Sequence, residues 1–287
     1  MVNEVTITTG HCPLPGFQRG AEQIRQLIQI RTEERINLTM FTVALIGPDG
    51  AGKTTVGRQL EDRLPYPVKY IYMGVSTDSS NVMLPTTRLV HMLKRAAGGK
   101  PDIAGPPDPN RVKKKPKGLL KRTLAEGRAV LRLLNRLSEE WYRQGLTWSY
   151  QRRGYIVLFD RHFFSDYYAY DIAEEGKQRD LTQRVHGFIL KHFYPKPDLV
   201  IYLDAPAAVL YARKGEGSIE ALERRRQDYL QLRNLVKHYA VVDAAQPQEQ
   251  VVQAVVARIW DFYHTQKKTG RDNHHQHEAK STHHSSH

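Results

Sequence analysis

The sequence predicts an α/β fold in which a parallel central sheet is flanked by helices. Three observations support this prediction. Short apolar runs alternate with segments of helical periodicity, and the glycine-rich stretch GPDGAGKTT follows the first run at residues 47–55. Two later runs, YIVLFD at residues 155–160 and LVIYLD at residues 199–204, both end in an aspartate. Strands that alternate with helices are typical of a parallel sheet that is covered on both faces.

The strands are predicted from apolar runs of five to ten residues that end at glycine, proline or an acid. The helices are predicted from apolar residues that recur every three or four positions. We expect strands at Met40–Ile46, Val68–Gly74, Tyr155–His162, Pro197–Pro206 and Tyr239–Asp243. We expect helices at about 21–38, 84–97, 119–153, 165–175, 181–193, 207–214, 219–238 and 248–263, with Gly127 and Gly145 as interruptions of the third.

These elements predict a single α/β domain at residues 40–264, preceded by a lead-in and helix at residues 1–39. Prolines, glycines and basic residues mark a mobile basic insertion at about residues 98–118. The polar, histidine-rich residues 265–287 are expected to form a disordered tail. Its HHQH and HHSSH clusters allow weak binding of a transition metal, but a solvated tail is the favoured interpretation.

Composition narrows the choice of compartment and of partner. The chain has 287 residues and a formal net charge of +13, which suggests an anionic partner such as nucleotide, nucleic acid or an acidic surface. Its one cysteine, Cys12, forms no internal disulfide, and a reducing compartment is expected. No secretory signal and no apolar run of about 20 residues is present, so we expect a cytoplasmic protein without a transmembrane segment.

The basic residues between Arg111 and Arg122 form the densest positive charge in the chain. Such a segment suits contact with a polyanion, either a phosphate backbone or an anionic lipid surface. A solvated loop that only aids solubility is an equally good interpretation. No aromatic residue interrupts the basic run, which argues against a platform that stacks single-stranded bases.

The stretch GPDGAGKTT has the spacing of a phosphate-binding loop between a strand and a helix. Its glycines let successive amide hydrogens point into one concavity, and the following helix adds the positive end of its dipole. The lysine can reach the outer phosphates and the first threonine can bind Mg²⁺. The pattern predicts a nucleoside triphosphate site made of Gly47, Asp49, Gly50, Ala51, Gly52, Lys53, Thr54 and Thr55.

Four segments carry a more specific resemblance. GPDGAGKTT, FDRHFFSD at residues 159–166, PDLVIYLDAPAAVLYARKGEG at 197–217 and LERRRQDYLQL at 222–232 occur in the order found in the thymidylate kinase family. The chain resembles that family from about Phe41 to Tyr263. The resemblance implies a P-loop fold of the nucleoside monophosphate kinase type and transfer of a phosphoryl group from ATP, with Mg²⁺, to a small acceptor. Members of the family are often dimers, which leaves a homodimer open.

The resemblance also implies roles for residues. Lys53 would hold the transferred phosphoryl group, and Thr54 and Asp160 would hold Mg²⁺, with Asp160 alternatively steering the attacking oxygen. Arg161 would grip the acceptor, most naturally a phosphate, because guanidinium binds phosphate bidentately. Arg213 and Lys214 would enter with a closing lid. The alternatives are a local Asp160–Arg161 ion pair and a solvated helix face for the lid cations. Asp204 is expected to be an N-cap rather than a catalytic group.

The acceptor region departs from the family pattern. The family's arginine-glutamate-proline-glycine-glycine-threonine segment is absent where this chain has YMGVSTDSS at residues 72–80, and SDYYAYD places Ala169 and Tyr170 one position late. A nucleoside monophosphate resembling dTMP is the leading acceptor. A hydroxyl acceptor on a nucleoside, sugar or glycan is the alternative, and a non-catalytic, nucleotide-dependent module that binds polyanions is the third. Aromatic residues near the expected acceptor either pack in the core, which is favoured, or stack on it: Phe163, Phe164, Tyr167, Tyr168 and Tyr170.

Overall fold

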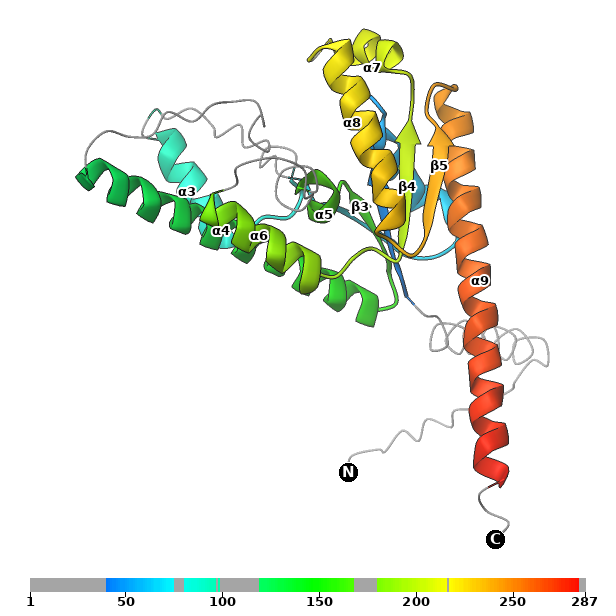
Figure 1. Ribbon diagram of the computed structural model, residues 1–287. Helices are drawn as coiled ribbons and strands as arrows, with labels where there is room; N and C mark the ends of the chain where they lie inside the picture. The colour runs from blue at the N-terminus through cyan, green and yellow to red at the C-terminus, as the bar shows by residue number, and fades with distance from the viewer. Residues whose placement is uncertain are drawn as a thin grey trace, which may run out of the picture. The chain divides into compact units, whose positions relative to one another are not determined.

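The computed structural model describes residues 40–74, 80–96, 98, 119–167, 180–215 and 217–283. The predicted helix at residues 21–38 and the basic insertion lie outside these residues, apart from Gly98. From Met40 onward the chain forms one compact unit built on a five-stranded sheet. The strand order is β2-β3-β1-β4-β5, as Figure 1 shows in part. Every neighbouring pair is parallel, which confirms the predicted fold class.

All five predicted strands are present, each slightly shorter than or equal to its predicted range. Parallel strands need a crossover between them, and in this chain helices supply it. In the central strand, Ala44 lies opposite Phe159 on one side and Val200 on the other. The strands are β1 (Thr42–Ile46), β2 (Val68–Tyr72), β3 (Ile156–Asp160), β4 (Leu199–Asp204) and β5 (Tyr239–Asp243).

The helices largely follow the predicted positions. Helices α8 and α9 lie beside β4 and β5, and α4 and α6 lie side by side (Figure 1). No helix among the described residues is both long and apolar enough to cross a membrane. The helices are α2 (Lys53–Arg63), α3 (Pro85–Ala96), α4 (Leu119–Arg152), α5 (Phe163–Tyr167), α6 (Leu181–His192), α7 (Ala207–Lys214), α8 (Ile219–Gln231) and α9 (Gln248–His283), with a 3₁₀ turn η2 (Leu232–Asn234).

The core lies on both faces of the sheet because alternate strand residues point to opposite sides. On one face, Ala44, Ile46 and Phe159 pack with aromatic residues of α5 and α8, among them Phe163 and Tyr229. On the other face, α2 comes so close that a Cβ at Gly57 would lie 2.9 Å from the ring of Tyr70. The sheet is therefore covered on both sides, as its apolar strands predict.

Three predicted helix boundaries or interruptions were wrong. Helix α4 runs unbroken through Gly127 and Gly145. One glycine costs only about 1 kcal/mol within a long helix, and neighbouring helix formers offset that cost. Helix α8 ends at Gln231 rather than His238, because the chain must reverse to enter β5 and the buried Leu232 anchors the turn. The backbone of α9 stays helical to His283, past the predicted end at Tyr263; residues 264–283 contain no proline and only one glycine.

Strand β2 is an edge of the sheet, and polar side chains satisfy its outer backbone groups. Glu61 accepts a hydrogen bond from the amide of Tyr70 (3.0 Å). The side-chain amide of Asn81 donates to the carbonyl of Tyr70 (2.8 Å) and accepts from the amide of Tyr72 (2.9 Å). Arg143 donates to the carbonyl of Tyr72 (3.3 Å). These contacts close an edge that would otherwise offer unpaired groups to another strand.

Candidate functional site

The phosphate-binding loop connects β1 to α2 and requires glycine for steric reasons. Gly47, Gly50 and Gly52 all have positive φ angles, of 149°, 89° and 83°. A Cβ at Gly47 would lie 2.6 Å from the carbonyl oxygen of Leu203, and one at Gly50 would lie 2.8 Å from that of Leu210. The loop therefore lies directly against the end of β4 and against α7, and larger residues would displace it.

Lys53 begins α2 and its side chain folds back over the loop. Its Nζ donates to the carbonyl oxygens of Gly47 and Pro48, both at 2.8 Å. The side chain is almost fully buried, and burial, together with the charge of Arg161, lowers the pKa of Lys53 to about 7. A bound anion would reverse this effect, since a negative charge favours the ammonium form. Of the neighbouring loop residues, Ala51 is buried, whereas Thr54 and Thr55 are exposed.

Asp160, at the carboxyl end of β3, meets the phosphate loop. The hydroxyl of Thr54 donates to Oδ2 of Asp160 at 2.5 Å, and the hydroxyl of Tyr70 donates to the same oxygen at 2.6 Å. Asp160 is fully buried, and its Oδ1 has no hydrogen-bond partner among the described residues. Tyr70 was not predicted as a site residue, because its place beside Asp160 depends on the pairing of β2 with β3.

These residues fit Mg²⁺. Hydroxyl and carboxylate oxygens are the hard donors that this ion prefers, and the unpartnered Oδ1 of Asp160 needs either a cation or a proton donor. The described residues contain no cluster of three or more histidine, cysteine, aspartate or glutamate side chains that would suit a different metal. The tail histidines before His283 have a helical backbone, but their side chains are outside the description.

Asp49 of the phosphate loop lies close to basic side chains from three parts of the chain. It forms a short ion pair with Nη2 of Arg161, and Nη1 of Arg225 lies 3.1 Å from its Oδ2. Nζ of Lys214 lies 3.9 Å from its Oδ1. Burial alone would raise the pKa of Asp49, but Arg161, Lys53 and Arg225 outweigh it and hold that pKa well below its ordinary value. The carboxylate therefore joins the phosphate loop to β3, α7 and α8.

Arg225 was missing from the predicted site. It lies on α8 within the run LERRRQDYLQL, where Arg224, Arg225 and Arg226 follow one another. The run marks a basic helix, but only the position of α8 shows which arginine faces the loop. Arg226 points instead to Asp204, which it contacts through two hydrogen bonds of 2.8 and 2.9 Å.

The backbone of Arg161 has an unusual conformation for a residue with a side chain. Its φ angle of 68° lies in the left-handed region, which residues other than glycine rarely adopt. Burial opposes its charge, but the carboxylates of Asp166 and Asp49 raise the pKa of Arg161 above its ordinary value. Burial raises the pKa of Asp166 to about 6, even though Arg161 and Lys53 oppose the shift. A carboxyl group that titrates near neutral pH thus lies among the cations of the site.

One expectation about the end of β4 is wrong. Asp204 is not the N-cap of α7: that position is held by Pro206, and Asp204 is paired with Arg226 and accepts a bond from Tyr202 (2.8 Å). Arg213 is exposed, and its Nη1 donates to the carbonyl of Ala244 after β5 (2.8 Å). Arg213 therefore lies beside the end of β5, whereas Lys214 approaches Asp49.

The aromatic residues after Arg161 pack in the core. Phe163, Phe164 and Tyr167 are all at most 3% exposed. Phe163 and Tyr167 contact the rings of Tyr194 and His186, respectively. This agrees with the favoured interpretation of these side chains and leaves none of the three to stack on an acceptor. Tyr168 and Tyr170 lie outside the described residues.

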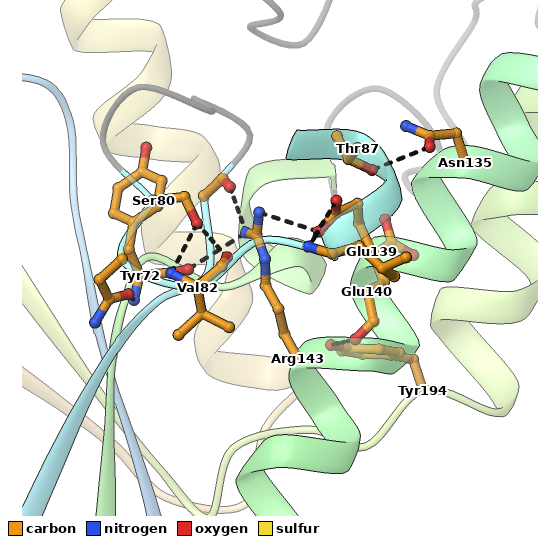
Figure 2. A network of polar contacts seen from close by, with 12 residues as sticks. Tyr72, Ser80, Val82, Thr87, Asn135, Glu139, Glu140, Arg143 and Tyr194 are labelled. Atoms are coloured by element: carbon orange, nitrogen blue, oxygen red, sulfur yellow. Dashed lines mark hydrogen bonds and ion pairs between the residues drawn. The ribbon is translucent and has the colours of Figure 1, made fainter. Parts of the chain in front are cut away.

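A further buried polar network, which was not predicted, joins α4 to the segment after β2 (Figure 2). Glu139, Glu140 and Arg143 of α4 are almost completely buried. Glu140 accepts from, or donates to, Nε2 of His186 at 2.8 Å, and neither side chain is exposed. Glu139 and Arg143 contact the segment that follows β2. The positions of these residues in the helix do not predict their burial, since charged residues normally face the solvent.

Comparison with known proteins adds independent information. Residues 87–255 match the family model described as thymidylate kinase. This range includes Asp160, Arg161 and Arg225 but begins after the phosphate loop. A thymidylate kinase from Alteromonas mediterranea is 32% identical over 130 residues, which make up 42% of this chain and 57% of that protein. The match thus spans little more than half of the relative's length.

Solved structures of similar proteins include two kinases. A deoxyadenosine kinase from M. mycoides with bound dATP has a TM-score of 0.45 and 16% identity, covering 76% of this chain and 98% of that one. A thymidylate kinase from Candida albicans has a TM-score of 0.48 and 18% identity, and the match covers 80% of this chain and 93% of that one. At these values neither structure bears on the function of this chain.

Proposed function

Starting from the premise that the chain belongs to the thymidylate kinase family, we propose that it transfers the γ-phosphoryl group of ATP to a nucleoside monophosphate. The observation that carries the proposal is the contact of Thr54 with Asp160, which joins the residue after Lys53 to the end of β3, directly before Arg161. Donor-binding and acceptor-binding groups thereby meet at the carboxyl edge of a parallel sheet, the usual place for a ligand in this kind of fold.

Catalysis of phosphoryl transfer depends mainly on positioning and on neutralising charge. The loop amides and Lys53 would bind the outer phosphates of ATP, with Nζ exchanging the carbonyls of Gly47 and Pro48 for phosphate oxygens. Thr54 and Asp160 would hold Mg²⁺, which neutralises the charge of the phosphates when bound. Arg161 would bind the acceptor phosphate, and Arg225 and Lys214 would add positive charge beside the loop.

A hydroxyl acceptor is the second candidate, and Asp166 is the observation that favours it. A hydroxyl, unlike a phosphate, must lose a proton as it attacks. Asp166 lies near Arg161 and Lys53, and its raised pKa of about 6 suits a group that accepts a proton near neutral pH. In that case Arg161 would orient Asp166 instead of holding a phosphate.

One experiment separates the two candidates. The protein is incubated with ATP and Mg²⁺ and offered dTMP, the other nucleoside monophosphates, thymidine and simple sugars, with Lys53→Ala as the control. The proposal expects dTMP or another monophosphate to be phosphorylated by the unaltered protein alone. Phosphorylation of thymidine or a sugar, with the monophosphates inert, would replace it with the second candidate.

We also propose that the protein is a homodimer joined through α4. The exposed face of this helix is apolar where polar residues are expected: Leu131 is 66% exposed, Leu134 54% and Trp148 40%. A Cβ at Gly127 or Gly145 would meet no atom within 4 Å, so the helix surface is open at these positions. The face, here called the α4 stripe, repeats every three or four residues: Leu124, Gly127, Leu131, Leu134, Ser138, Trp141, Gly145 and Trp148.

The α4 stripe is self-complementary. Its members are arranged symmetrically about residue 136, so two antiparallel copies of α4 would bring equivalent positions together. A two-fold axis requires such a pattern, and a stripe of spacing three and four suits helices that cross at a small angle. The facing pairs would be Leu124 with Trp148, Gly127 with Gly145, Leu131 with Trp141, and Leu134 with Ser138.

A further inference from the structure

Arg143 takes part in none of the steps proposed above, although it is a buried cation next to the acceptor side. We propose that Arg143 is a positioning residue that holds Gly74 against the side chain of Arg161 and so fixes the direction of the Arg161 guanidinium. The inference rests on the proposed role of Arg161 in binding the acceptor phosphate.

The first link joins Arg143 to the end of β2. Arg143 lies on α4 and is 3% exposed, and it points toward Tyr72 (Figure 2). Its Nη1 donates to the carbonyl of Gly74 at 2.9 Å and to that of Tyr72 at 3.3 Å. A guanidinium is rigid and planar, so two bonds from one nitrogen fix the backbone of residues 72–74 relative to α4.

Glu139 extends this hold to the start of α3. Its Oε2 lies 3.6 Å from Nη2 of Arg143, one helical turn away on α4. Its carboxylate also accepts the backbone amide of Leu84, at 3.2 and 3.3 Å to the two oxygens. The pair therefore fixes both ends of the connection between β2 and α3, from Gly74 to Leu84.

The second link joins Gly74 to Arg161. A Cβ at Gly74 would lie 2.5 Å from Cδ of Arg161, so the glycine is in direct contact with that side chain. The guanidinium carbon of Arg143 also lies 5.3 Å from the ring centroid of Phe163, two residues after Arg161. Arg143 thus contacts both Gly74, which lies against the side chain of Arg161, and Phe163, which follows Arg161 by two residues.

The energetics favour a geometric role over a stabilising one. Nε of Arg143 is buried and has no hydrogen-bond partner among the described residues. A buried charge with incomplete partners costs stability, and an apolar residue of similar volume is often at least as stable. An apolar residue would not hold the two carbonyls at the end of β2. The guanidinium supplies geometry that an apolar side chain lacks.

The test uses two variants that break the chain of contacts at different points. Arg143→Met removes the bonds to Gly74, and Gly74→Ala places a methyl group against both Cδ of Arg161 (2.5 Å) and the hydroxyl of Tyr72 (2.5 Å). Steady-state kinetics with ATP and dTMP should show the KM for dTMP raised about tenfold in both variants, with the KM for ATP within about twofold of the unaltered value. Arg143→Lys should recover part of the loss. Thr147→Val is the matched control, because this buried hydroxyl donates to the backbone carbonyl of Arg143 (3.0 Å) and its loss leaves the contacts of the Arg143 guanidinium in place.

Other outcomes overturn the inference. Variants that only lower the unfolding temperature, or that raise both KM values alike, would show that Arg143 is purely structural. Should the unaltered protein phosphorylate no monophosphate, the proposed function fails, and the ¹⁵Nε signal of Arg161 in an NMR spectrum decides the positioning separately. The chemical shift of that signal should change in Arg143→Met and Gly74→Ala but not in Thr147→Val. An unchanged chemical shift in the first two variants would contradict the inference.

Discussion

The hydroxyl of Thr54 lies 2.5 Å from Oδ2 of Asp160, although 106 residues separate them in the chain. Thr54 lies in the first turn of α2 and Asp160 ends β3, and the parallel pairing of β1 with β3 brings both to one edge of the sheet. The contact leaves Oδ1 of Asp160 buried and without a hydrogen-bond partner among the described residues.

Asp160→Asn should reduce kcat at least about 100-fold, because it removes the negative charge that would hold Mg²⁺ while preserving the shape of the side chain. Tyr70→Phe is the matched control: it removes one hydrogen bond to Asp160 but leaves the carboxylate, and we expect a loss below about threefold. Initial rates with dTMP over a range of Mg²⁺ concentrations check both. A kcat for Asp160→Asn within tenfold of the unaltered protein would contradict the metal role.

Arg225→Ala should raise the KM for ATP about tenfold, since it removes a positive charge next to the phosphate loop. Arg226→Ala should leave that KM unchanged and lower the free energy of unfolding by about 1–2 kcal/mol, because it breaks the paired bonds to Asp204. ATP kinetics and urea unfolding of both variants test the difference. An equal rise in the KM for ATP in both variants would show that Arg225 has no specific role and that only the total positive charge of α8 matters.

His186→Leu should lower the free energy of unfolding by about 3–5 kcal/mol. It would leave the carboxylate of Glu140 buried without its partner. One buried, unpaired charge destabilises a protein more than the replacement of both partners by apolar residues. The double variant Glu140→Leu with His186→Leu should be more stable than His186→Leu alone. Urea denaturation measures all three proteins. A double variant less stable than the single one would mean that packing, not charge, sets the cost.

Acid should destabilise the protein through His162. Burial lowers the pKa of His162 to about 3, against about 6.5 in the unfolded chain. Between these values the unfolded state binds the extra proton, so this group's contribution to stability is complete above pH 6.5 and falls by about 1.4 kcal/mol per pH unit below it. His162→Asn keeps an acceptor for the amide of Phe164, which bonds Nδ1 at 3.3 Å. The free energy of unfolding of this variant should fall less steeply between pH 6.5 and 4.

Leu131→Glu should convert a dimer to a monomer, because it would place a carboxylate opposite the partner's apolar stripe. Arg132→Glu is the control, since Arg132 is exposed on α4 but lies outside the α4 stripe. Sedimentation equilibrium gives the molecular mass of each protein. A monomeric unaltered protein would rule out the α4 interface.

Local pattern was enough for the strands, the phosphate loop and the position of Asp160 at a strand end, followed by Arg161. In each case neighbouring residues determine the structure: apolar runs form buried strands, and glycines permit the turn that points amides toward a phosphate. The same patterns gave wrong ends for α8 and α9, since a helix end depends on where the chain must turn and on what it packs against.

Only the folded chain shows which charged side chains pair with one another. Nothing in the run Arg224–Arg226 distinguishes the arginine that meets Asp49 from the one that meets Asp204, because both choices are compatible with an exposed helix. The sequence does not predict the burial of Arg143 for a further reason. A buried guanidinium is stable only where carbonyls and a carboxylate from distant parts of the chain surround it. Local sequence patterns were therefore sufficient to predict the residues of the phosphate loop and the positions of the strands. Only the packing of α4 and α8 against the sheet determined which cations lie beside the phosphate loop and Arg161, because those contacts join residues far apart in the chain.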